Sequence, residues 1–267
     1  MSTMAKALTI AGSDSGGGAG IQADLKTFQE RGVFGTSVIT AVTAQNTLGV
    51  HGVYPQSLES IEAQLHAVLS DIGADALKTG MLFSAEIIEL VSKLCKEYNV
   101  TNIVVDPVMI AKGGSELLQQ EAVEALTTQL LPLATVITPN LPEAEKILGA
   151  GSIKTLGDMK EAVRELKSVG PQSVVLKGGH LEDEIATDLF FDGERMIPFE
   201  TPRINTKHTH GTGCTFAACI AAELAKGNSL VESVTVAKQF ITAAIEHSLM
   251  LGTGIGPTNH AAHRLKK

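Results

Sequence analysis

The stretch His210-Gly211-Thr212-Gly213-Cys214-Thr215 joins an irregular segment to one of helical character, because residues 214–225 are almost all apolar or small. Thr212 or Gly213 can cap that helix, and the glycines let a ligand approach the backbone closely. The first N–H groups of a helix lack partners within it, and the helix dipole adds positive charge at that end. The stretch therefore predicts a phosphate site with the Cys214 thiol at its edge, or else a glycine loop before a buried helix.

Two further stretches end predicted strands with a proline and a polar side chain. One is Ile103-Val104-Val105-Asp106-Pro107-Val108-Met109, and the other is Val136-Ile137-Thr138-Pro139-Asn140-Leu141-Pro142-Glu143. Open α/β sheets bind ligands at the carboxyl ends of their strands, so Asp106, Asn140 and Glu143 are expected on one rim. They could hold hydrated Mg²⁺ through few protein oxygens, although each alone could simply cap a strand end. Together with the anion site, they predict phosphoryl transfer.

Strand and helix patterns alternate along the whole chain. We expect strands at 7–11, 37–42, 76–79, 103–106, 136–138 and 173–176, and helices at 21–30, 58–70, 85–98, 120–130, 142–148 and 155–169. The Asp192-Gly193 turn predicts a hairpin, and two helices end the chain, the second at a capping box from Ser229 to Glu232. This order predicts a mostly parallel sheet with helices on both faces and an antiparallel edge. No linker divides the chain, so residues 1–267 are expected to form one domain.

Composition excludes several classes of protein. The chain has 267 residues, of which 29 are acidic and 21 basic, and the net charge of −8 is unlike that of nucleic-acid-binding proteins. Residues 1–11 do not have the length or flanks of a signal peptide, and no apolar run approaches the roughly 18 residues of a membrane span. Cys95, Cys214 and Cys219 show no metal-type spacing and fit a reducing compartment. We therefore expect a cytoplasmic protein without nucleic-acid or membrane partners.

The glycine-rich segment 12–20 follows the first predicted strand. Gly18, Gly20 and Ala23 match a variant of the dinucleotide fingerprint, but that fingerprint needs an acid roughly 20 residues later, and residues 31–58 contain none. An oxidoreductase is therefore not favoured, and the loop is expected to serve a small substrate. Asp24, one turn into the next helix, could face that substrate or lie in solvent. Gln45 is expected just beyond a strand end, where its amide suits the edge of an uncharged heterocycle.

Other loops add weaker signals. Lys177-Gly178-Gly179-His180 is a turn that exposes its backbone at the same rim. Lys112-Gly113-Gly114 looks mobile, and its lysine could reach phosphates or remain in solvent. His208 and His210 are two apart on an extended stretch, and we interpret them as loop histidines rather than as zinc ligands.

These stretches, in this order, resemble the hydroxymethylpyrimidine and phosphomethylpyrimidine kinases of thiamine biosynthesis, which have the ribokinase-like fold. The resemblance runs from Leu8-Thr9-Ile10-Ala11-Gly12-Ser13-Asp14 to Gly254-Ile255-Gly256-Pro257, and is most specific at residues 18–28, 44–47, 105–109 and 209–215. It implies a three-layer α/β/α domain with a mostly parallel central sheet, an antiparallel edge and a small lid. It also implies a homodimer.

The resemblance further implies a role for each candidate residue. Gln45 would bond the aminopyrimidine, in a pocket also lined by Gly12, Ala19, Asp24, Met81 and Val108. Asp106, Asn140 and Glu143 would organise Mg²⁺ and its waters beside the triphosphate of ATP, with Asp106 and Glu143 as the metal ligands. The residues in contact with ATP and the transferring phosphoryl group would be Lys177, Gly178, Gly179 and Thr212, with Gly211, Gly213 and Cys214 as the catalytic set at the helix start.

The implied activity is that of an ATP- and Mg²⁺-dependent kinase for 4-amino-5-hydroxymethyl-2-methylpyrimidine and then for its monophosphate. Many ribokinase-like enzymes carry Asp where this chain has Cys214. A helix N-terminus lowers a thiol pKa, so we hypothesise a Cys214 thiolate that acts as general base in the first transfer only. The alternatives are a pyridoxal kinase of the same branch, some of which carry a lid cysteine where Ala111 stands here, and a catalytically silent pyrimidine sensor.

Overall fold

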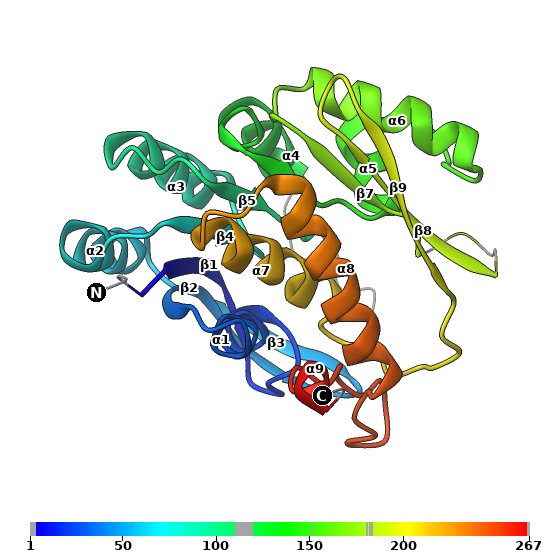
Figure 1. The fold of residues 1–267 in the computed structure, drawn as a ribbon. Helices are drawn as coiled ribbons and strands as arrows, with labels where there is room; N and C mark the ends of the chain where they lie inside the picture. The colour runs from blue at the N-terminus through cyan, green and yellow to red at the C-terminus, as the bar shows by residue number, and fades with distance from the viewer. Residues whose placement is uncertain (1–3, 110–119, 150, 180, 182–183, 266–267) are drawn as a thin grey trace.

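The computed structural model describes residues 4–109, 120–149, 151–179, 181 and 184–265. Within these residues, a nine-stranded sheet runs in the order β3-β2-β1-β4-β5-β6-β7-β8-β9 (Figure 1). Its strands are β1 (Lys6–Asp14), β2 (Phe34–Asn46), β3 (Gly49–Pro55), β4 (Ala76–Thr79), β5 (Ile103–Val105), β6 (Val136–Ile137), β7 (Val174–Lys177), β8 (Ile185–Phe191) and β9 (Met196–Pro202). The strands from β2 to β7 in this order are parallel, and β3, β8 and β9 are antiparallel.

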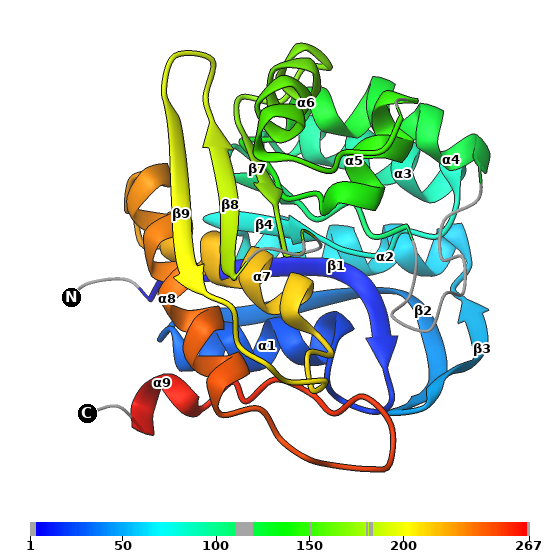
Figure 2. The same ribbon diagram turned by 90° about the vertical axis from the view of Figure 1, so that its right-hand side faces the viewer.

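Helices cover both faces of the sheet, which gives three layers (Figures 1 and 2). One face packs against α1 (Gly20–Glu30), α7 (Thr212–Ala225) and α8 (Leu230–Glu246), with the short α9 (Ala262–Leu265) after α8. The other face packs against α2 (Leu58–Ala67), α3 (Ala85–Glu97), α4 (Gln120–Ala125), α5 (Leu141–Leu148) and α6 (Leu156–Ser168). Helices α2 and α4 continue into π-helical turns at Val68–Ile72 and Leu126–Leu130, and the second is followed by the 3₁₀ turn Leu131–Leu133.

Helix α7 decides where the functional groups meet. Every residue from Thr215 to Leu224 is buried, as expected of a helix that is apolar on all sides. It packs between α8 and the central strands β1, β4 and β5. Its N-terminus therefore lies inside the molecule, close to the carboxyl end of β5. Among the described residues, no helix is both long and apolar enough to cross a membrane.

Most of the expected elements are confirmed. The hairpin through Asp192-Gly193 is β8–β9, and the capping boxes at Thr155–Asp158 and Ser229–Glu232 are both formed. The small lid stays a prediction.

The expected end of the second strand is wrong. Strand β2 continues to Asn46 and turns into β3, which was not predicted, with Gln45 opposite Val50. Residues 49–55 contain two glycines and a proline and lack a regular alternation, which hid the strand. The sheet therefore has antiparallel strands at both edges, and α9 is a third, unpredicted helix at the C-terminal end.

Candidate active site

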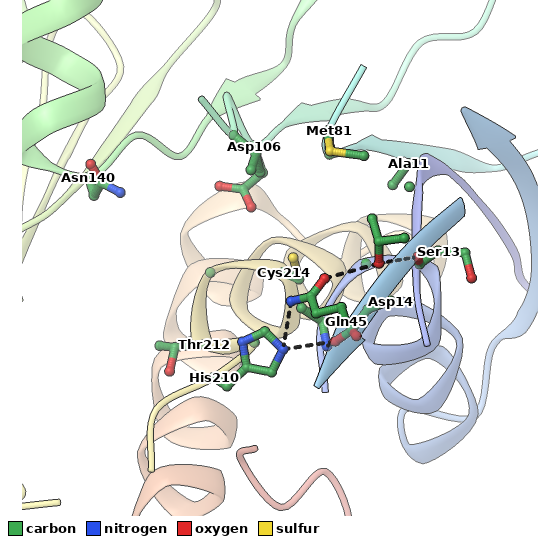
Figure 3. Close-up of a pocket in the computed structure, with 18 of the residues that line it drawn as sticks. Ala11, Ser13, Asp14, Gln45, Met81, Asp106, Asn140, His210, Thr212 and Cys214 are labelled. Carbon is green, nitrogen blue, oxygen red and sulfur yellow. Dashed lines mark hydrogen bonds and ion pairs between the residues drawn. The ribbon is translucent and has the colours of Figure 1, made fainter. Parts of the chain in front are cut away.

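A cavity opens where the carboxyl ends of the central strands meet the start of α7 (Figure 3). The cavity is lined by the glycine-rich segment 12–20, the end of β2, the ends of β4 and β5, and the start of α7 with His210 before it. Its lining consists of Ala11, Gly12, Ser13, Asp14, Ala19, Gly20, Thr43, Gln45, Gly80, Met81, Asp106, Val108, Asn140, Glu143, Lys177, His210, Gly211, Thr212, Gly213 and Cys214. The structure thus brings together most of the residues that the sequence singled out.

The N-cap of α7 lies one residue before Thr212 and two before Gly213, the two expected caps. This N-cap is Gly211, whose φ of 82° is left-handed, and a Cβ there would overlap the carbonyl oxygen of Gly18. The Thr212 hydroxyl donates to the carbonyl of Thr209 at 2.8 Å instead of capping. Helix geometry leaves the N–H groups of Gly213 and Cys214 without an intrahelical partner, and both residues line the cavity. The helix start can therefore hold an anion.

Asp106, Glu143 and Lys177 form a charged group beside that helix start. Asp106 accepts hydrogen bonds from Lys177 Nζ at 3.0 Å and from Thr138 Oγ1 at 3.1 Å. Glu143 caps α5 reciprocally, since its carboxylate accepts from Asn140 N at 2.8 Å and its own N–H donates to Asn140 Oδ1 at 2.9 Å. The capping box therefore fixes where the Glu143 carboxylate points.

Burial sets the ionisation of this group. Loss of water raises the pKa of Glu143 to about 7, against the opposing effect of Lys177. Burial alone would lower the pKa of Lys177, but the carboxylates of Asp106 and Glu143 outweigh it and raise that pKa. A cation near Glu143 would favour its charged form, so the site is suited to binding positive charge.

The oxygen donors fit a hydrated Mg²⁺ rather than a fully protein-bound metal. Among the described residues, no three His, Cys, Asp or Glu side chains are grouped to hold a metal ion. Mg²⁺ commonly binds one or two carboxylates and completes its shell with water and substrate phosphates. Asp106 and Glu143, which line the same cavity, can supply that share.

Cys214 lies in the cavity wall, in surroundings that do not favour the hypothesised thiolate. Burial raises the pKa of the Cys214 thiol to about 11; Lys78 opposes this rise, and Asp24 and Asp106 add to it. Lost hydration is the largest of these effects. A thiol with a pKa of about 11 is neutral at pH 7.

Asp24 is not part of the cavity lining, contrary to expectation. It is fully buried, and its carboxylate accepts two hydrogen bonds from Lys78 Nζ at 2.9 Å and one from Thr9 Oγ1 at 2.6 Å. Lys78, on β4, is also fully buried. The pair joins α1 to the sheet within the core, and because its members are 54 residues apart, no local pattern could reveal it. A buried carboxylate needs such a partner more than it needs a ligand.

A second cavity adjoins the first and shares Asn140, Lys177, Thr212 and Gly213 with it. Its apolar walls come from β8, β9, the segment after β9, α7 and α8, and include Ala186, Pro202, Ile204, Phe216, Ile241 and Ile245. Gly179 lines this cavity as expected, whereas Gly178 lies behind it. The Gly178 N–H donates to Asp188 Oδ1 at 3.0 Å, and a Cβ there would overlap the carbonyl of Thr187.

Sequence reasoning missed part of the first cavity. His210, interpreted as a loop histidine, lies in the cavity wall with Nε2 2.8 Å from Asp14 Oδ2 (Figure 3). Its position directly before Gly211 was the available signal. Gln45 does line the cavity, but from within β2 rather than beyond it. Lys112-Gly113-Gly114 and His180 lie outside the described residues.

Comparison with known proteins places this arrangement in a family. Residues 14–259 match the sequence pattern of the protein family described as phosphomethylpyrimidine kinase. The chain is 55% identical over 260 residues to the hydroxymethylpyrimidine/phosphomethylpyrimidine kinase of Bacillus subtilis (strain 168), covering 97% of this chain and 96% of the relative.

Solved structures agree with this match. An ADP complex of Bacillus subtilis pyridoxal kinase has a TM-score of 0.93 at 50% identity and covers 98% of this chain and 100% of that one. Pyridoxal kinase from Staphylococcus aureus in complex with AMP-PCP and pyridoxal has a TM-score of 0.92 at 40% identity, with 98% and 95% covered. The expected three-layer ribokinase-like fold is confirmed by these neighbours. With the family match running through nearly the whole chain, this protein belongs to the phosphomethylpyrimidine kinase family.

Proposed function

We propose that this chain is an ATP- and Mg²⁺-dependent kinase of thiamine biosynthesis that phosphorylates 4-amino-5-hydroxymethyl-2-methylpyrimidine and then its monophosphate. One observation carries the proposal. A single cavity combines Met81, Val108 and the Gln45 amide with the α7 N-terminus and Asp106. An amide and apolar side chains lining one cavity suit a polar heteroaromatic ring, and the helix start suits the phosphoryl group that the ring's hydroxymethyl oxygen would receive.

Catalysis in this proposal is mostly positioning and charge stabilisation. Gln45, Gly12, Ala19, Met81 and Val108 would hold the ring, and the N–H groups of Gly213 and Cys214 would hold the transferring phosphoryl oxygens. Mg²⁺ bound by Asp106 and Glu143 would neutralise phosphate charge. Lys177, already paired with Asp106, would add a positive charge beside the same oxygens.

ATP would extend from this point into the second cavity. The apolar walls of the second cavity suit a planar base. Lys177 and Thr212, which line both cavities, would contact the phosphates, and Asn140 and Gly179 would lie nearby. The ADP and AMP-PCP complexes of the two structural relatives support a nucleotide in this fold. Gly178 would act only indirectly, through the turn that Asp188 holds.

A pyridoxal kinase is the second candidate, because both reported structural relatives bear that name. The decisive assay measures ADP release with hydroxymethylpyrimidine, with its monophosphate and with pyridoxal under the same conditions. We expect turnover of both pyrimidines and a lower kcat/KM for pyridoxal. A higher kcat/KM for pyridoxal, with no turnover of the monophosphate, would establish the second candidate instead.

We further propose that residues 1–267 act as one kinase domain, that the protein is a homodimer, and that it works in the cytoplasm. The proposed cytoplasmic location is supported by the three free cysteines, because thiols stay reduced in a reducing compartment. The net charge of −8 does not favour a nucleic-acid partner.

A further inference from the structure

Gln45 belongs to a hydrogen-bonded chain whose donors and acceptors do not balance (Figure 3). Thr43 Oγ1 lies 2.9 Å from the carbonyl oxygen of Ser13 and 3.1 Å from Gln45 Oε1. Gln45 Nε2 lies 3.5 Å from His210 Nε2. The same ring nitrogen lies 2.8 Å from Asp14 Oδ2.

Asp14 decides where the proton of His210 sits. Its carboxylate accepts the N–H groups of Gly16 at 2.7 Å, Gly18 at 3.1 Å and Ala19 at 2.9 Å. Burial would raise the pKa of Asp14, but His210 and the backbone hydrogen bonds from Ala19 and Gly16 outweigh it and lower that pKa. An ionised carboxylate can only accept. His210 Nε2 therefore carries a hydrogen and acts as a donor.

That hydrogen creates a conflict at Gln45. The amide NH₂ group faces His210 Nε2–H, so two donors oppose each other. The Thr43 hydroxyl, which has a single hydrogen, faces two acceptors, the Ser13 carbonyl and Gln45 Oε1. A half-turn of the amide exchanges its oxygen and nitrogen without changing the space that it fills.

The half-turn removes the opposition of two donors and leaves the Thr43 hydroxyl with one acceptor. Gln45 Nε2 then donates to Thr43 Oγ1, which gives its own hydrogen to Ser13. The His210 Nε2 hydrogen stays directed at Asp14 Oδ2 at 2.8 Å, and Gln45 Oε1, at 3.5 Å, becomes the second and longer acceptor of the same hydrogen. We propose that His210 is a specificity-determining positioning residue, which holds the Gln45 amide in the orientation that reads a ring with an amino group beside a ring nitrogen. This step rests on the proposed function for the identity of the ring.

The fixed amide leaves one donor and one acceptor for a ligand. The second lone pair of Oε1 can accept from an amino group, and the second hydrogen of Nε2 can donate to the adjacent ring nitrogen. A freely turning amide presents this pattern for only part of the time, and its reversed orientation sets donor against donor and acceptor against acceptor. His210 therefore acts through Gln45 on ligand choice.

The backbone of His210 is held firmly enough for this role. Its N–H donates to the carbonyl of Gly256 at 3.1 Å, and its carbonyl accepts from Thr258 N at 3.0 Å. These bonds form a short parallel bridge between His210 and Pro257. Asp14 then fixes the ring at its other end, so the imidazole has little freedom to follow Gln45.

The test compares two ligands by equilibrium binding: 4-amino-5-hydroxymethyl-2-methylpyrimidine and the same compound without its amino group. The wild-type protein should prefer the amino compound by roughly 5- to 150-fold, the range for one unpaired buried polar group. His210→Leu should shrink that preference about 2- to 12-fold, the net value of one hydrogen bond. His210→Gln, which restores a donor at nearly the same place, should keep it.

A matched control lies two residues away in the same loop. His208 Nδ1 accepts from Gly256 N at 3.0 Å, but His208 lines neither cavity. His208→Leu should lower the melting temperature and leave the ligand preference unchanged. If it reduces the preference as much as His210→Leu does, the effect belongs to loop stability and the inference fails.

A measurement on the wild-type protein makes the test independent of folding defects. NMR should show contacts from the Gln45 side-chain NH₂ hydrogens to the Thr43 methyl group and not to the His210 ring. Contacts to the ring, or a His210→Leu variant with the full wild-type preference, would overturn the inference. A wild-type protein that binds both compounds equally also overturns it while leaving the proposed function intact. If neither pyrimidine binds, the proposed function itself fails.

Discussion

Glu143 has a carboxylate whose burial in the cavity wall makes its charged form unfavourable for the stability of the fold. The side chain is 7% exposed, and burial raises its pKa to about 7 from the ordinary 4.5. Its geometry is fixed by the capping box with Asn140. Even beside Lys177, the charged form of Glu143 is therefore less favourable here than in water.

The first prediction concerns stability without ligands. Because the folded pKa lies above the unfolded value, the protonated carboxyl stabilises the fold fully below about pH 4.5, and this contribution is lost as the pH rises through about 7. Glu143→Gln stays neutral at every pH. We expect the melting temperature of the wild type to fall relative to that of Glu143→Gln between about pH 5 and pH 8. Parallel curves for the two proteins would contradict the assigned burial effect.

The same variant should lose activity. The amide oxygen introduced by Glu143→Gln could still accept the Asn140 N–H bond, so the fold should hold, but the variant lacks the charge that attracts Mg²⁺. We expect Glu143→Gln to lower kcat by about 10- to 100-fold, the usual range for disturbed metal surroundings. Turnover measured across a range of Mg²⁺ concentrations checks this. Wild-type turnover at saturating Mg²⁺ would remove Glu143 from the mechanism.

Cys214 gives the next prediction. A thiol with a pKa of about 11 is not ionised at pH 7, so it cannot serve as a resting base for the first transfer. We expect Cys214→Ala to slow the phosphorylation of hydroxymethylpyrimidine and of its monophosphate by the same factor, because the thiol shapes the anion site used by both. Single-turnover rates of the two steps decide the matter. A selective loss of the first step would restore the general-base hypothesis.

At the scale of elements, the start of α7 is locked to the glycine-rich loop after β1. Gly211 needs its left-handed backbone for the cap, and it also needs to lack a Cβ because the Gly18 carbonyl fills that space. The anion site and the substrate loop therefore pack directly against each other, and one is not expected to move without the other.

A pair of glycines at the two ends of α7 separates these requirements. Gly211 has φ 82° and Gly227 has φ 86°, but a Cβ on Gly227 would meet nothing within 4 Å. Gly227→Ala should cost only the left-handed backbone, about 1–2 kcal/mol. Gly211→Ala should destabilise more and also slow phosphoryl transfer. Urea unfolding and kcat measured for both variants test this, and equal losses would show that the contact with Gly18 does not matter.

At the scale of the whole molecule, exposed apolar side chains gather at one edge of the sheet. Strand β3 is an edge strand, and Leu48, Tyr54 and Val42 on or beside it are 67%, 62% and 42% exposed. Edge strands and apolar patches are common sites of association. This edge is therefore our choice for the interface of the proposed homodimer.

The assembly prediction follows from that choice. Light scattering should give twice the 28.0 kDa mass of the chain, and the double variant Leu48→Lys with Tyr54→Lys should give the single mass. Ile185, 50% exposed on β8 near the other end of the sheet, provides the control. Ile185→Lys should leave the dimer intact. A wild-type monomer would refute the dimer, and a dimeric double variant would refute the interface.

Local patterns determined most of the secondary structure and the outline of the site. Strand 76–79, the Asp192-Gly193 hairpin and the capping boxes could be read directly, because neighbouring residues alone decide alternation, turns and caps. The apolar run of α7 likewise predicted a buried helix, and its N-terminus lies at the candidate site. Asp106, Asn140 and Glu143 were placed correctly on one rim because parallel strands end on the same side.

Tertiary structure alone decided what depends on distant contacts and on the exclusion of water. Asp24 became a buried partner of Lys78 rather than a cavity residue. Residues 49–55 formed β3 by pairing with β2, although their own sequence does not favour a strand. The raised pKa of Cys214 and the place of His210 in the cavity wall depend on what surrounds each side chain in space. The sequence alone shows which side chains could bind ligands or form ion pairs. Only packing decides which of them meet, and how much water is left to stabilise their charges.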